Sequence, residues 1–122
     1  KLGAYVIGGI TDHITPWKGG YGTARLFGDD STFVLANAGH LQSLINPPGK
    51  PKSFYVAAPA SEEDPLEWAK RHDDKRQEGS WWPHWRQWIQ ARSGEQLPAP
   101  KKAGSRKYKP LGAAPGEYVL ER

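Results

Sequence analysis

Two stretches of this chain carry side chains that could do acid–base chemistry. Thr11–Trp17 contains Asp12, and Asn37–His40 ends in His40. A carboxylate and an imidazole are two of the three groups of a nucleophilic triad, in which the imidazole takes up a proton near neutral pH and the carboxylate fixes its tautomer. The third group is absent, because the chain has no cysteine and its serines lie in no nucleophile motif. Asp12 and His40 are therefore the candidate catalytic residues.

Each candidate follows a short apolar run that is typical of a buried strand. Residues 4–10 and 32–36 are rich in apolar and β-branched side chains. Between these runs, Thr15–Pro16 has the pattern of a helix N-cap followed by proline at the first helical position, and the predicted helix ends near Phe27. The sequence thus predicts a strand, a helix and a second strand.

This order of elements predicts an α/β fold in which parallel strands are joined by crossover helices. Ligands gather beyond the carboxyl ends of parallel strands, so Asp12 and His40 are expected at one edge of the sheet. Taken alone, Asp12 could simply stabilise a turn, and His40 could be an ordinary loop histidine. The pair together has the chain order of the α/β-hydrolases, acid before histidine, which favours a functional role.

The middle of the chain predicts shorter elements. One helical turn is expected at 41–45 and a short third strand at 53–57. A helix over 65–71 follows a capping box at 61–64. In that helix, Leu66 and Trp68 are candidate buried residues.

A second amphipathic helix is predicted over residues 80–92. Trp81, Trp85, Trp88 and Ile89 fall at helical spacing and form an apolar stripe, which favours core packing. Trp82 lies off this stripe and is the candidate for an exposed tryptophan that contacts an apolar partner surface.

Composition separates a folded part at residues 1–93 from an extended tail at 94–122. The tail is rich in proline, glycine and lysine, and a segment near Tyr118 could dock on the rest. Its basic residues contribute much of the formal net charge of +4.

No apolar run approaches the roughly 20 residues of a membrane helix. The chain also supplies too few elements to cover a strand as apolar as residues 4–10, so we expect it to be part of a larger domain.

Two other classes of site are not favoured by the sequence. The spacing of the four histidines matches no common metal-ligand pattern, so no metal site is expected. The basic tail could bind phosphates, but no RNA-binding signature accompanies it, and no nucleic-acid partner is expected.

Four segments resemble the C-terminal end of the catalytic domain of bacterial polyhydroxyalkanoate synthases. They occur in the family's order and span nearly the whole chain: Asp12–Trp17, Gly39–Gly49, Gly79–Trp85 and Ala114–Arg122. This resemblance implies the C-terminal part of an α/β-hydrolase fold. It also implies an acyltransferase that polymerises 3-hydroxyacyl-CoA with release of CoA, with the CoA thioester as substrate and no cofactor.

The resemblance assigns roles to both candidate residues. Asp12 and His40 match the family's catalytic aspartate and histidine. The family's nucleophile is a cysteine in a G-x-C-x-G elbow, which would lie upstream of Lys1 because these 122 residues contain none. His40 would deprotonate that cysteine. Asp12 would either orient His40 or assist deprotonation of the incoming 3-hydroxyl, and the sequence leaves both roles open.

Further expectations follow from the resemblance. The partners would be the growing polyester chain, the rest of the synthase polypeptide, a second copy of the parent in a homodimer, and the surface of polymer granules in the cytoplasm. The 122-residue chain alone would be inactive. Two alternatives stay open: an α/β-hydrolase esterase with a serine elbow upstream, and a module that binds granules or anionic surfaces.

Overall fold

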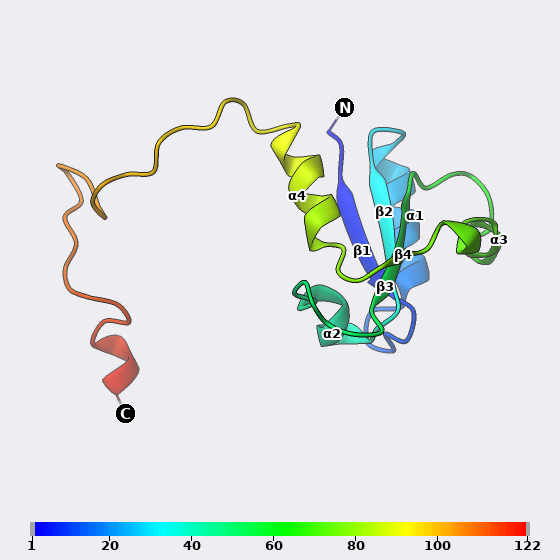
Figure 1. Ribbon diagram of the computed structural model, residues 1–122, viewed down its shortest axis with the longest axis horizontal. Coiled ribbons are helices and arrows are strands. Elements are labelled where there is room, and N and C mark those ends of the chain that lie inside the picture. Colours follow the sequence, from blue (N-terminus) through cyan, green and yellow to red (C-terminus); the bar gives the residue numbers. More distant parts are fainter. Residues whose placement is uncertain (1, 122) are drawn as a thin grey trace.

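The chain folds around one mixed four-stranded sheet with helices on both faces (Figure 1). The computed structural model describes residues 2–121. Its strands are β1 (Tyr5–Gly9), β2 (Thr32–Ala36), β3 (Phe54–Ala58) and β4 (Gln77–Glu78), in the spatial order β1-β2-β3-β4. The predicted α/β class is therefore confirmed at the level of a mixed sheet with helices.

The predicted crossover unit is formed by β1, α1 (Trp17–Phe27) and β2. β1 pairs with β2 in parallel, with Tyr5 opposite Thr32 and Gly9 opposite Ala36. The connection between them is α1 (Trp17–Phe27). The carboxyl ends of both strands consequently meet at one edge of the sheet, as the sequence predicts.

The other half of the sheet departs from the prediction of parallel strands. β3 runs antiparallel to β2, and β4 runs antiparallel to β3. The only helix between β2 and β3 is α2 (His40–Leu44). Five helical residues rise about 7.5 Å, whereas a five-residue strand is about 16 Å long. Because α2 is too short to carry the chain back along β2, β3 starts from the same edge and runs in the opposite direction.

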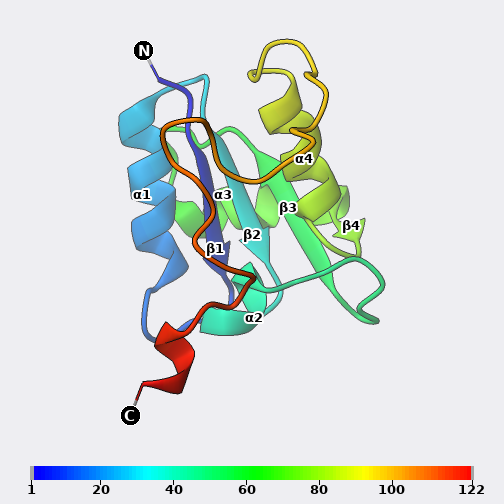
Figure 2. The same cartoon turned by 90° about the vertical axis from the view of Figure 1, so that its left-hand side faces the viewer.

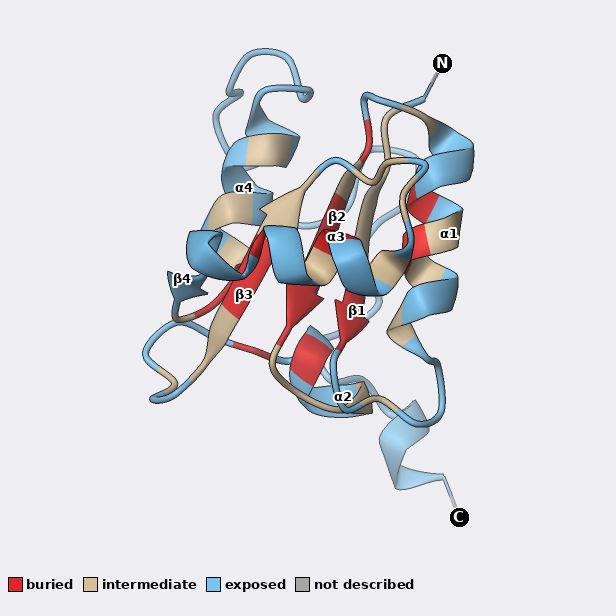
Figure 3. Cartoon of the chain, turned by 90° about the vertical axis from the view of Figure 1, so that its right-hand side faces the viewer, coloured by how far each residue is buried: buried red, intermediate tan, exposed pale blue. Residues whose placement is uncertain are grey.

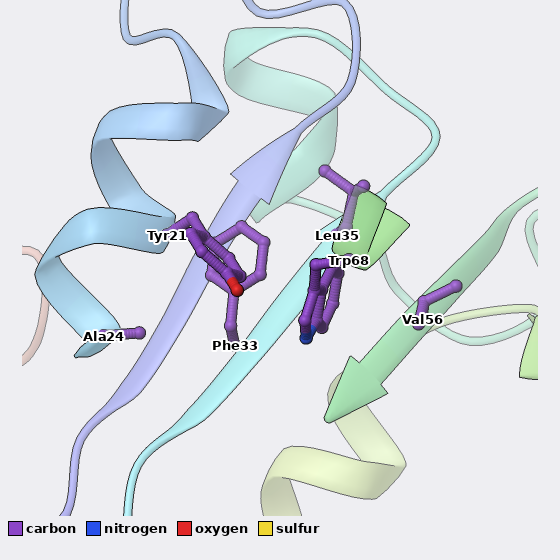
Figure 4. Packing of buried hydrophobic residues seen from close by; sticks show 6 residues of the cluster. All are labelled: Tyr21, Ala24, Phe33, Leu35, Val56 and Trp68. Carbon is purple, nitrogen blue, oxygen red and sulfur yellow. The ribbon is translucent and has the colours of Figure 1, made fainter. Parts of the chain in front are cut away.

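One face of the sheet is covered by α1 and α3 (Pro65–Arg71). Tyr21, Phe33 and Trp68 are fully buried there, with ring centroids 5.3–5.5 Å apart in edge-to-face arrangements (Figure 4). Trp68 is thus the core residue that the sequence predicts. Figure 3 shows the buried residues of the central strands behind α3.

Two predicted details of α3 are wrong. Leu66 is 46% exposed rather than buried. The helix is capped by Asp64, whose side chain accepts a hydrogen bond from the Leu66 backbone N–H at 2.8 Å. Ser61 instead donates its hydroxyl to Glu63. Asp64 accepts one free N–H group at the start of the helix and Pro65 has none, so Asp64 takes the place of the predicted capping box.

The opposite face of the sheet is covered by α4 (Trp82–Gln90). Trp81 is buried against Val34, Ala36 and Tyr55. The expectation of an exposed Trp82 is wrong, because Trp82 is half-buried and its Nε1–H donates to the Leu44 carbonyl at 3.0 Å. Trp85, predicted to lie in the buried stripe, is 41% exposed.

Residues 91–121 are all exposed and run away from the sheet (Figure 1). They contain one short 3₁₀ turn, η2 (Tyr118–Leu120), and another 3₁₀ turn, η1 (Asp73–Lys75), lies earlier in the chain. The division of the chain at residue 93 stays a prediction. Over residues 2–121, the helices are all too short or too polar to cross a membrane.

Candidate active site

Asp12 sits in a tight turn just beyond the carboxyl end of β1. Its backbone N–H donates to the Gly9 carbonyl at 3.1 Å. Its Oδ1 accepts the backbone N–H groups of Ile14 and Thr15, both at 2.9 Å. An aspartate that bonds to the backbone two and three residues ahead fixes its own side-chain rotamer. The turn therefore holds Oδ2 in a set direction.

His40 is the first residue of α2, which is packed closely against the end of β1. A Cβ atom placed on Gly9 would lie under 3.0 Å from Ser43 Oγ and from the Ala38 carbonyl oxygen. Ser43 in turn donates its hydroxyl to the Gly39 carbonyl at 2.6 Å. The missing side chain of Gly9 is what lets the start of α2 approach β1 this closely.

The far end of α2 is held by the residues that lead into α4. Trp81 donates its indole N–H to the Ser43 carbonyl at 2.6 Å, and Trp82 makes the matching bond to the Leu44 carbonyl. A helix of five residues has little stability of its own, so these bonds to its free carbonyls fix its position. One end of α2 is thus packed against β1, and the other is bonded to the start of α4.

Asp12 and His40 meet at this edge of the sheet. His40 Nδ1 lies 2.9 Å from Asp12 Oδ2, and the Asp12 side chain is only 6% exposed while that of His40 is 36% exposed. Figure 2 shows α2 beyond the carboxyl ends of β1 and β2. The prediction that the two residues lie at one edge of the sheet is confirmed, although their catalytic roles stay a prediction.

Asp12 is held in its ionised form by its hydrogen bonds. Burial alone would raise the pKa of this carboxyl, but the bonds from Thr15, His40 and Ile14 outweigh burial and hold the pKa of Asp12 well below its usual range. A carboxylate that stays charged favours the tautomer of His40 that carries its proton on Nδ1. The Nε2 lone pair is then free to accept a proton.

The remaining histidines lie in other parts of the molecule. His13 is exposed, His72 is buried with its Nδ1 2.9 Å from the Trp68 carbonyl, and His84 Nδ1 lies 2.8 Å from the Tyr5 hydroxyl. Within residues 2–121, histidine, aspartate and glutamate form no group of three or more that could hold a metal ion.

One residue at this site was not predicted from the sequence. Thr15 was expected to cap α1, but α1 is preceded by Pro16 and has no side-chain cap. The Thr15 hydroxyl instead donates to Asp12 Oδ2 at 2.7 Å and lies 3.2 Å from His40 Nδ1. A threonine three residues after an aspartate is a known local hydrogen-bonding pattern, and it is the one signal that could have indicated this contact.

The fold and the site define a class: an α/β chain that presents an oriented acid–imidazole pair at the edge of a mixed sheet. The chain is similar over its whole length to poly(3-hydroxyalkanoate) polymerases. It is 54% identical over 123 residues to poly(3-hydroxyalkanoate) polymerase 2 of Ectopseudomonas oleovorans and 44% identical over 125 residues to polymerase 1 of the same organism. It is also 36% identical to the polymerase subunit PhaC of Cupriavidus necator over 94% of the chain. The predicted resemblance to polyhydroxyalkanoate synthases is confirmed.

These matches cover a small part of each relative. The chain spans 21%, 22% and 19% of the length of these three proteins, respectively. No protein-family model matches the chain.

Proposed function

We propose that this chain is the C-terminal part of the catalytic domain of a polyhydroxyalkanoate synthase with an α/β-hydrolase fold. The similarity to the polymerases over the whole chain carries this proposal. It is supported by the order of β1, Asp12, α1, β2 and His40 along the chain and by the 2.9 Å contact between Asp12 and His40.

In this proposal, His40 is the general base of a Cys-His-Asp triad. Its Nδ1–H donates to Asp12, so Nε2 can take the proton of a cysteine thiol supplied by the rest of the polypeptide. The thiolate attacks the thioester carbonyl of 3-hydroxyacyl-CoA and forms a new thioester to the enzyme. The bond to the CoA sulfur breaks, and CoA leaves with the proton from His40. The 3-hydroxyl of another unit then attacks the acyl-enzyme while His40 takes its proton. The ester forms as the thioester bond to the cysteine breaks, and the cysteine leaves as the thiol with the proton from His40.

We assign Asp12 the role of orienting His40. Its two oxygens already accept four hydrogen bonds: those of the Ile14 and Thr15 backbone, the Thr15 hydroxyl and His40. A carboxylate with about four acceptor positions has no position left for a substrate hydroxyl. Its 6% exposed fraction supports the same role, because the substrate would have little access.

The test replaces each member of the pair in the full-length polypeptide. Asp12→Asn and His40→Gln are each expected to lower turnover by about 10⁴-fold, as loss of a triad member does. The measurement is the release of CoA from 3-hydroxybutyryl-CoA. His13→Gln is the matched control, because His13 is exposed beside Asp12 and makes no described contact with the pair; it is expected to retain full turnover. If turnover survives either Asp12→Asn or His40→Gln, the triad assignment is wrong.

The partners and location of the parent are part of the same proposal. They are the growing polyester chain, the rest of the synthase polypeptide, a second parent copy in a homodimer, and polymer granules in the cytoplasm. The 122-residue chain alone has no cysteine to act as the nucleophile. We expect the purified chain to release no CoA, and measurable release would contradict the proposed mechanism.

An esterase is the second candidate, because an acid–imidazole pair of this geometry also serves serine nucleophiles. The codons before Lys1 distinguish the two candidates. A G-x-C-x-G sequence there supports the synthase, and G-x-S-x-G supports the esterase.

A further inference from the structure

The hydroxyl of Thr15 lies between the acid and the imidazole of the proposed triad. Its Oγ1 is 2.7 Å from Asp12 Oδ2 and 3.2 Å from His40 Nδ1, and Oδ2 is itself 2.9 Å from Nδ1. The three polar atoms therefore form a closed triangle. Thr15 is the only residue whose backbone and side chain both bond to Asp12 among the described contacts.

The positions of the protons in this triangle follow from chemistry. The ionised Asp12 carboxylate can only accept hydrogen bonds, so the single hydroxyl proton of Thr15 points at Oδ2. A lone pair of Oγ1 then faces His40 Nδ1. If Nδ1 carried no proton, it would face the Asp12 and Thr15 oxygens without receiving a hydrogen bond from either. Both neighbours thus favour the tautomer with the proton on Nδ1, which leaves Nε2 free.

We propose that Thr15 is a positioning residue for the triad, acting through Asp12 and His40 rather than on substrate. Its hydroxyl fixes the direction of Oδ2 and supports the Nδ1–H tautomer of His40. This inference rests on the proposed function of the pair. It assigns to one hydroxyl a role that the backbone N–H of Thr15 cannot supply, because that N–H bonds to the other oxygen, Oδ1.

The test compares two substitutions of Thr15 in the full-length polypeptide. Thr15→Val keeps the shape and the backbone N–H but removes the hydroxyl, and Thr15→Ser keeps the hydroxyl. One lost hydrogen bond to a charged group corresponds to a fall in kcat of about tenfold for Thr15→Val. KM for 3-hydroxybutyryl-CoA should stay within about twofold, because Thr15 is not assigned to substrate binding. Thr15→Ser should restore kcat to within about threefold of wild type.

The rate per folded molecule separates positioning from a merely structural role. A variant that only lowers the amount of folded enzyme would reduce the rate in proportion to the folded fraction, which circular dichroism measures. Loss of the Thr15 hydroxyl should instead lower kcat per folded molecule and leave KM in place, and Thr15→Ser should reverse the loss. A kcat per folded molecule that equals the wild-type value in Thr15→Val would overturn the proposal.

Combination with Asp12→Asn separates this inference from the proposed function. If Thr15 acts through Asp12, Thr15→Val should cause no further loss in the Asp12→Asn background. Suppose that Asp12→Asn is inactive. If Thr15→Val then matches wild type, or if Thr15→Ser fails to restore kcat, the positioning role of Thr15 is wrong and the proposed roles of Asp12 and His40 stand. If Asp12→Asn itself keeps full turnover, the proposed function fails instead.

Discussion

At the scale of single residues, the site depends on a position that carries no side chain. Gly9 is the last residue of β1. The space where its Cβ atom would lie is occupied by the Ala38 carbonyl oxygen before α2 and by the Ser43 side chain in α2. Because one of the contacted atoms is the backbone oxygen of Ala38, the clash cannot be relieved by a side-chain rotation. The distance between Asp12 and His40 therefore depends on Gly9.

We predict that Gly9→Ala moves α2 away from β1. The cost in unfolding free energy should be about 1–3 kcal/mol, as for other overpacked positions, and turnover should fall because His40 moves with α2. Urea unfolding and CoA release measure the two effects.

Gly22→Ala is the matched control for this substitution. Gly22 lies inside α1 with no atom within 4 Å of an added Cβ, so alanine there should stabilise the protein by about 1 kcal/mol and leave turnover unchanged. If Gly9→Ala is as stable and active as Gly22→Ala, the close approach of α2 to β1 is not needed.

The sequence predicts the acid and the imidazole of the site but not what holds them. Asp12 and His40 could be found because each follows an apolar strand, and parallel strands end at one edge. The contact of Thr15 with both was missed, since a threonine before a proline is also a typical helix cap, and the spacing from Asp12 was the one signal for the alternative. The two cases differ in the direction of the Thr15 hydroxyl, which in the structure donates to Asp12 Oδ2.

At the scale of elements, the sequence predicts the position of β3 but not its direction. The sequence predicts a strand at 53–57, and β3 forms at Phe54–Ala58. Its antiparallel direction was missed, although the sequence predicts only one helical turn before it. That turn is short because Asn46 is followed by two prolines, and α2 ends at Leu44. The consequence of so short a connection for the direction of β3 was not drawn from the sequence.

The packing of α4 on the sheet includes a partly buried histidine, His84, whose contribution to stability can be tested by pH. The Tyr5 hydroxyl and His84 Nδ1 are 2.8 Å apart, and the Tyr55 ring lies 6.0 Å from the imidazole. Burial lowers the pKa of His84. Burial, with a further contribution from Tyr55, raises the pKa of Tyr5. Near pH 7, His84 is therefore neutral in the folded protein, and Tyr5 keeps its hydroxyl proton.

We predict that His84 makes the folded protein less stable as the pH falls below about 6.5. Below that pH, His84 binds a proton in the unfolded chain but not yet in the folded chain. The free energy of unfolding therefore falls as the pH drops from the unfolded pKa to the lower folded pKa of His84. His84→Gln should flatten this part of the profile. The midpoint of urea unfolding, measured between about pH 7.5 and pH 5.5, reports the difference. An equal slope in wild type and His84→Gln would show that α4 carries no such dependence.

At the scale of the whole molecule, the folded part and the exposed tail differ in what they bury. Two aromatic clusters lie on the two faces of the sheet, whereas residues 91–121 are exposed throughout. The apolar side chains of Tyr118, Val119 and Leu120 are among the exposed residues, and the docking that the sequence suggests for this segment stays a prediction.

We predict that ending the chain after Ser93 changes the unfolding free energy by less than about 0.5 kcal/mol, because no buried contact is lost. Ending it after Gln87 is the matched control. That change removes Trp88, whose ring lies 5.4 Å from that of Tyr5, and loss of such a side chain costs about 3–5 kcal/mol. Urea unfolding of both shortened proteins gives the comparison. If removal of the tail alone costs as much as the control, residues 94–121 dock on the folded part in solution, and the boundary at residue 93 does not separate two independent parts.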